Sequence, residues 1–111
     1  MGVKIITSQK KMSAYLEGEI DHHSAAPIRE EIDREIMLRK PEVLIIDFGG
    51  VTFMDSSGIG LVMGRYRTIA LSGGKLIVSN LSPQFYKIMK LSGIEKIASI
   101  SKRENAYESK K

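Results

Sequence analysis

The fold of this chain is best read from the stretch Phe53-Met54-Asp55-Ser56-Ser57-Gly58-Ile59-Gly60, because an extended segment enters a helix there. Asp55 or Ser56 is suited to cap that helix, since a short polar side chain can accept a hydrogen bond from the free N–H groups of a first turn. Apolar residues then recur at steps of three and four, and Gly73-Gly74 follows them. This spacing predicts a helix with an apolar face formed by Ile59, Val62, Met63, Tyr66 and Ile69.

Strands are predicted on both sides of this helix. Residues 43–46 form a continuous apolar run with β-branched side chains, which is typical of a central strand covered on both faces. Residues 76–78 predict a second buried strand, and residues 97–100 predict a short one. Residues 4–8 and 12–17 predict an opening hairpin whose second strand ends at Gly18.

Other helices are indicated by spacing and by capping residues. Isoleucines at positions 28, 32 and 36 predict an amphipathic helix between an N-cap at Ser24 and Pro41. Ser82-Pro83 predicts the start of a helix that Gly93 stops. Residues 101–104 have capping-box spacing, which indicates a short last helix. The predicted order is β-β-α-β-α-β-α-β plus that last helix, an α/β fold with a mixed sheet and packed helices.

Length and composition restrict the classes of protein that the chain can belong to. Its 111 residues suit one domain over residues 1–111, with a short basic tail from about residue 101. It has no cysteine, which excludes disulfides and thiolate-metal sites. No apolar run approaches the ~18 residues of a membrane span, so we expect a cytoplasmic protein without one. The net charge is +4, and no basic block is interleaved with aromatic residues, so direct nucleic-acid binding is not expected. No cofactor is expected.

The turn at Ser56 and Ser57 can accept a negatively charged group. The free N–H groups of a first helical turn point outward, and the helix macrodipole is positive there. A phosphate on a serine would bring about −1.5 to −2 charges to that position, and it need not unfold the helix. Spacing alone favours a plainer interpretation, in which the turn is only a helix cap and Gly60 and Gly64 let the helix lie close to the sheet.

Three motifs resemble a known family. Residues 53–60, continuing as Gly64-Arg65-Tyr66, resemble the signature of the STAS domain and, more narrowly, of the sporulation anti-sigma factor antagonists. Residues 18–23, Gly-Glu-Ile-Asp-His-His, are similar to that group's second motif, and Ser92-Gly93-Ile94 is similar to a weaker third one. The resemblance covers nearly the whole chain and implies a mixed sheet with helices packed around it.

The resemblance also implies a mechanism. The unphosphorylated protein would bind an anti-sigma F factor, which is also an ATP-dependent serine kinase, and would thereby release sigma F. The kinase would phosphorylate the serine that follows the aspartate, here Ser56, and a serine phosphatase would restore the free form. The implied partner surface contains Asp21, His22, His23, Ser24, Asp55, Ser56, Ser57, Gly58, Ile59 and Gly60.

Two features depart from the family pattern. Position 24 is serine where threonine is familiar, which keeps a hydroxyl group at that place. The tail after Ile100 is short and rich in lysine compared with the family.

Other functions use the same residues. Asp21, His22 and His23 with Ser56 contain the residue types of a hydrolase triad, although Ser56 is not in a Gly-x-Ser-x-Gly elbow. His22 and His23 are expected in a loop, and adjacent histidines are poorly spaced for joint metal ligation, so no metal site is expected. A general-stress anti-sigma factor antagonist or a stressosome-type STAS protein is the alternative within the family, and the Asp-His-His motif favours the sporulation branch.

Overall fold

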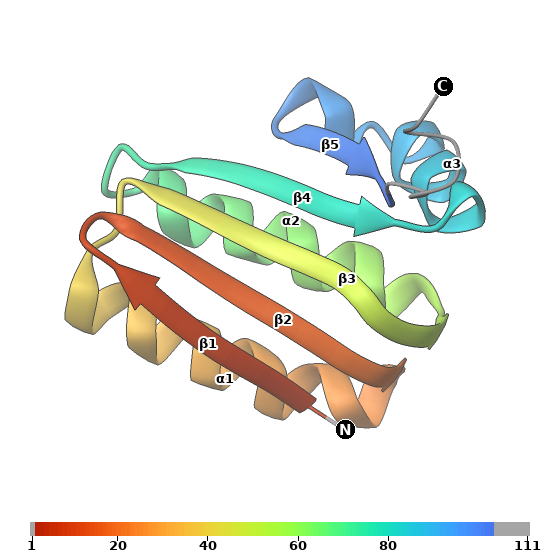
Figure 1. Ribbon diagram of the computed structural model, residues 1–111, viewed down its shortest axis with the longest axis horizontal. Helices are drawn as coiled ribbons and strands as arrows, with labels where there is room; N and C mark the ends of the chain where they lie inside the picture. Colours follow the sequence, from red (N-terminus) through yellow and green to blue (C-terminus); the bar gives the residue numbers. More distant parts are fainter. Residues whose placement is uncertain (1, 104–111) are drawn as a thin grey trace, which may run out of the picture.

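The computed structural model describes residues 2–103 and contains a mixed five-stranded sheet with three α-helices (Figure 1). The elements follow the predicted order, with a short 3₁₀ helix before the last strand. They are β1 (Gly2–Ser8), β2 (Lys11–Ile20), α1 (His22–Arg39), β3 (Val43–Met54), α2 (Ser56–Ala70), β4 (Lys75–Leu81), α3 (Pro83–Leu91), η1 (Ile94–Lys96) and β5 (Ser99–Lys102). The predicted α/β class and the opening hairpin are therefore confirmed.

The order of strands in the sheet is the order in the chain, β1-β2-β3-β4-β5. β1 pairs with β2 antiparallel, and every later pair is parallel. Parallel neighbours joined by a helix form right-handed crossovers, so successive crossovers in one direction place their helices on the same face of the sheet. In Figure 1, α1 and α2 accordingly lie behind the sheet, side by side.

Within residues 2–103, one face of the sheet is therefore left without helices, and there the prediction that residues 43–46 are covered on both faces was wrong. Leu44 and Ile46 are fully buried, whereas Val43 and Ile45 are only partly buried. The open face carries a row of paired residues across the sheet, with Ile6, Ile45 and Ile77 among its members. The side chain of Ile6 is 48% exposed there.

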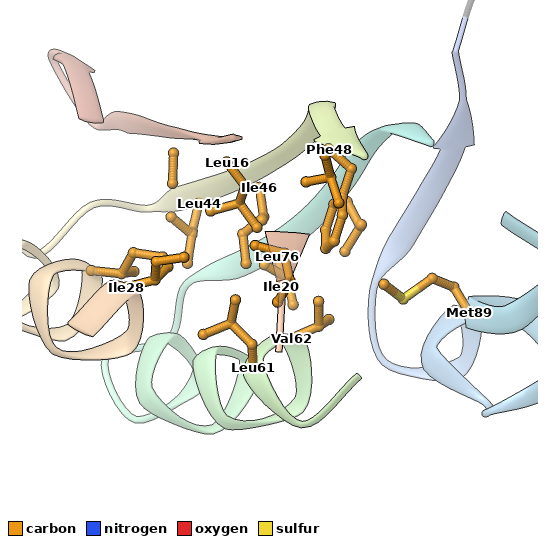
Figure 2. Close-up of a cluster of buried hydrophobic side chains, with 14 of the residues drawn as sticks. Leu16, Ile20, Ile28, Leu44, Ile46, Phe48, Leu61, Val62, Leu76 and Met89 are labelled. Atoms are coloured by element: carbon orange, nitrogen blue, oxygen red, sulfur yellow. The ribbon is translucent and has the colours of Figure 1, made fainter. Parts of the chain in front are cut away.

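The hydrophobic core lies between the sheet and the helices. Figure 2 shows Leu44, Ile46 and Leu76 of the strands directed toward Leu61 and Val62 of α2. Ile28 reaches the same core from α1, and Met89 reaches it from α3 (Figure 2). Each fully buried side chain of this size contributes roughly 1.5–3 kcal/mol to folding. The core therefore fixes the positions of both helices next to the strand ends.

Several element boundaries differ from the sequence-based ones. β2 continues past Gly18 to Ile20, and β3 continues through residues 47–54, because the two strands pair in parallel along this length. The last strand begins at Ser99 instead of residue 97, since Ile97 and Ala98 follow the turn of η1. Ser101 and Lys102 are in that strand, and the predicted last helix beyond them lies outside the described residues.

No helix among residues 2–103 is both long and apolar enough to cross a lipid bilayer.

Candidate functional site

The two sequence motifs meet at the carboxyl ends of β2 and β3. Ile20, the last residue of β2, is the register partner of Met54, the last residue of β3. The backbone N–H of Asp55 donates a hydrogen bond to the carbonyl of Ile20 over 3.1 Å. Asp21 and Asp55 each follow a strand directly and precede a helix, so the two helix starts lie next to each other at one edge of the sheet.

Asp55 is the N-cap of α2, in agreement with the prediction. Its Oδ1 accepts a hydrogen bond from the N–H of Ser57 over 2.7 Å. Ser56 is the first residue of the helix and is exposed, and its hydroxyl makes no hydrogen bond with the residues that the structure describes. Ser57 is partly buried. The two serines thus differ in exposure, and Ser56 is the more accessible one.

Gly58 holds the start of α2 against the sheet. A Cβ atom at this position would lie 2.2 Å from Cγ and 2.4 Å from Sδ of Met54, which is itself buried. By contrast, Gly60 and Gly64 have no atom within 4 Å of such a Cβ. The interpretation that these two glycines permit close packing was therefore wrong, because close approach occurs at Gly58.

Asp21 is the N-cap of α1, which corrects the assignment of that cap to Ser24. Its Oδ1 accepts hydrogen bonds from the N–H groups of His23 and Ser24, each over 2.9 Å. Ser24 is the third residue of the helix, and its hydroxyl accepts a hydrogen bond from the N–H of Asp21 over 3.0 Å. The same hydroxyl donates to the carbonyl of Glu19 over 2.7 Å. This reciprocal capping box joins β2 to α1.

The electrostatics of both helix starts favour negative charge. The hydrogen bond from the Ser24 N–H lowers the pKa of Asp21, with smaller help from His23 and the Ser24 hydroxyl and in spite of some desolvation. Neither α1 nor α2 has an acidic residue in its first turn. The positive ends of two helix dipoles therefore lie side by side, next to the capping carboxylates of Asp21 and Asp55.

His22 and His23 are the first two residues of α1, which corrects their placement in a loop. Both side chains are exposed, and their rings meet edge to face with centroids 5.8 Å apart. Within residues 2–103, neither imidazole forms a hydrogen bond to Asp21 or Ser56, so these residues are not connected as a triad. No group of three or more potential metal ligands occurs in the same part of the chain.

A groove of about 450 Å³ runs between α1 and α2 from the serine turn. Its lining includes His22 and Arg29 from α1 and Ser57, Gly60 and Gly64 from α2.

An ion pair closes the far part of this groove. Nε of Arg65 lies 2.7 Å from Oδ1 of Asp33, and the Arg65 side chain is only 5% exposed. A guanidinium N–H of Arg65 also donates to the carbonyl of Leu61 over 3.2 Å. Burial lowers the pKa of Arg65, Asp33 opposes this effect, and the like charge of Arg29 adds to it. The ion pair of Arg65 with Asp33 therefore joins α2 to α1.

Two features of the site were missed in the sequence. One is Phe53, the next-to-last residue of β3. Its side chain is 52% exposed beside the serine turn, and Phe53 pairs in register with Glu19. It was overlooked because the strand was predicted only over residues 43–46. The groove could have been found from residues spaced three or four apart on each helix, such as Ser57, Gly60 and Gly64.

Comparison with known proteins identifies the family. A family model described as the STAS domain matches residues 6–107. The chain belongs to the STAS domain family. It is 36% identical over 89 residues to the anti-sigma F factor antagonist of Paenibacillus polymyxa, covering 80% of this chain and 76% of that protein. This relative is a regulatory protein by name, and the resemblance seen in the motifs is confirmed.

Two solved structures of SpoIIAA are similar to this STAS domain. The anti-sigma factor antagonist SpoIIAA in its unphosphorylated form has a TM-score of 0.77 and 30% identity, with 96% of this chain and 91% of that chain covered. The Bacillus cell fate determinant SpoIIAA in the phosphorylated form has a TM-score of 0.71 and 31% identity, with 98% and 99% covered. The chain is thus a homologue of anti-sigma factor antagonists.

Proposed function

We propose that this STAS domain is an anti-sigma factor antagonist that is switched off by phosphorylation of Ser56. In this proposal the free protein binds an anti-sigma F factor that is also a serine kinase, which releases sigma F. The observation that carries the proposal is Ser56 itself: an exposed residue with an unbonded hydroxyl, at the first position of a helix that has no acidic residue in its first turn.

The switch acts through the surface and not through unfolding. A phosphate on Ser56 lies in the positive field of the α2 start, which stabilises negative charge. Gly58 packed on Met54 and the hydrogen bond from Asp55 to Ile20 hold the turn from beneath. Both forms of SpoIIAA are similar in fold to this chain, which supports the same conclusion. A partner that fits a neutral serine then meets added bulk and charge, and a loss of ~3 kcal/mol lowers affinity roughly a hundredfold.

The partner surface combines both helix starts. Asp21, His22, His23, Asp55 and Ser56 are at least partly exposed at one edge of the sheet and are available for contact. Ser57, Ile59 and Gly60 continue this surface along α2. Ser24 and Gly58 are buried, so their part is to shape the surface from within.

A phosphorylation assay tests the central step. The protein is incubated with an anti-sigma F factor kinase and ATP, and its intact mass is measured. We expect one added phosphate, which disappears in Ser56→Ala and persists in the matched control Ser57→Ala. A phosphate that is retained in Ser56→Ala, or lost only in Ser57→Ala, contradicts the assignment.

A binding assay tests the antagonist function. The unphosphorylated protein should bind the anti-sigma F factor in the presence of ADP, and the phosphorylated form should not. Treatment with a serine phosphatase should restore binding. The same titration with a general-stress anti-sigma factor decides between the two branches, because only the cognate kinase should bind tightly and transfer phosphate.

A further inference from the structure

Two glycines of α2 line the groove between α1 and α2. Gly60 and Gly64 lie one helical turn apart on α2, and a Cβ at either position would meet nothing within 4 Å. Glycine costs about 1 kcal/mol relative to alanine inside a helix, so two glycines facing open space weaken α2 without a packing benefit within the described residues. Their effect is to keep the groove open next to Ser57.

The charge of the groove is positive. The basic residues in its lining are His22, Arg29 and Arg65, and no carboxylate from residues 2–103 is part of that lining. Arg65 is balanced by Asp33 at 2.7 Å. Arg29 is exposed and forms no ion pair with any residue between 2 and 103. The guanidinium of Arg29 therefore lines the groove without a carboxylate partner among residues 2–103.

From this arrangement we infer that the α1–α2 groove receives an acidic segment of the anti-sigma partner, with a carboxylate side chain paired to Arg29. A planar guanidinium binds a carboxylate through two parallel hydrogen bonds, and the bare backbone at Gly60 and Gly64 admits the chain that carries it. The inference rests on the proposed function and adds the chemistry of the contact.

The position of the groove connects it to the switch. Ser57 lines its mouth, and Ser56 is the adjacent residue. A phosphate on Ser56 brings like charge to the place where the acidic segment enters. Phosphorylation then weakens the same contact that the groove provides, in addition to its steric effect.

Charge reversal at Arg29 tests the inference. Affinity for the anti-sigma F factor is measured by titration calorimetry for the wild type, Arg29→Glu and the matched control Arg34→Glu, which is exposed on α1 but does not line the groove. We expect Arg29→Glu to weaken binding about tenfold or more and to reduce its dependence on salt. Arg34→Glu should remain within about twofold.

A second variant separates binding from folding. Gly64→Leu fills the groove and replaces a poor helix former, so its melting temperature should not fall while its affinity drops about tenfold. Equal affinity of wild type, Arg29→Glu and Gly64→Leu overturns the groove inference alone. Absence of binding by the wild type overturns the proposed function itself. Loss of self-association in Arg29→Glu, with unchanged partner affinity, assigns the groove to a second copy and also overturns the inference.

Discussion

The N–H of Asp55 and the carbonyl of Ile20 form a 3.1 Å hydrogen bond that joins the start of α2 to the end of β2. Because Ile20 also pairs in register with Met54, the capping residues Asp21 and Asp55 occupy equivalent positions on neighbouring parallel strands. Two motifs that are distant in the sequence therefore act as one surface. This relationship makes the site sensitive to changes in the packing beneath it.

Gly58→Ala should destabilise the protein. The new methyl group would overlap the buried Met54 side chain, and overpacking of this kind costs roughly 1–3 kcal/mol. Alanine recovers about 1 kcal/mol through helix propensity, so we expect a net loss of up to about 2 kcal/mol in the free energy of urea unfolding. Gly64→Ala is the matched control and should raise stability by about 0.5–1 kcal/mol, since its methyl group enters open space. Equal effects of the two variants would rule out the packing role of Gly58.

Asp33→Ala should be more destabilising than its partly exposed position suggests. It leaves the buried Arg65 guanidinium without its counter-charge, at a cost of about 2–3 kcal/mol in the free energy of unfolding. The double variant Asp33→Leu with Arg65→Met removes both charges and should lie closer to the wild type. Chemical denaturation of the three proteins measures the difference. A double variant that is less stable than Asp33→Ala contradicts the argument.

Asp21 should make folding stability depend on acid pH. Its pKa is lowered from 3.8 in the folded protein, chiefly by the hydrogen bond from the Ser24 N–H. Its contribution is therefore complete above the unfolded-state pKa of 3.8 and is lost as the pH falls through the lower folded-state value. Asp21→Asn keeps a capping oxygen but does not titrate. Melting temperatures measured between about pH 6 and pH 2 should fall more steeply for the wild type than for Asp21→Asn. Parallel curves would contradict this role.

Phe53→Ala should weaken partner binding more than it affects folding. The ring is 52% exposed beside the serine turn, and a truncated aromatic anchor typically costs more than ~1 kcal/mol of association, or about fivefold in affinity. Leu71→Ala is the control, because Leu71 is 89% exposed at the opposite end of α2. Titration of each variant with the anti-sigma F factor provides the comparison. If both variants bind like the wild type, Phe53 is outside the interface.

Periodic features of this sequence were predicted well. The isoleucines of α1 are all buried, and Ser82 caps α3 by accepting a hydrogen bond from the Phe85 N–H over 3.1 Å, as the Ser-Pro pair indicated. Asp55 was also recognised as a suitable cap of α2. These features depend on local spacing and capping chemistry, which a single sequence carries in full.

Features that depend on tertiary pairing were not predicted. Residues 47–54 contain Asp47, Gly49 and Gly50, residue types that are depleted in strands, yet pairing with β2 makes all of residues 47–54 part of β3. The cap at Asp21 was missed because the residue three positions later is Ser24 instead of the Glu or Gln of a familiar capping box. The open sheet face follows from the handedness of three successive crossovers, which no local pattern reports.

The strand order has a consequence for how the chain folds. Each strand pairs with the strand that precedes or follows it in the chain. Each parallel pair is closed across one intervening helix, as between Lys11 and Val43, and this loop closure must precede pairing and slows it. The elements that carry the two helix starts, β2, α1, β3 and α2, end at Ala70. During synthesis, the partner surface formed by the starts of α1 and α2 can thus begin to assemble while β4 and β5 are still being made.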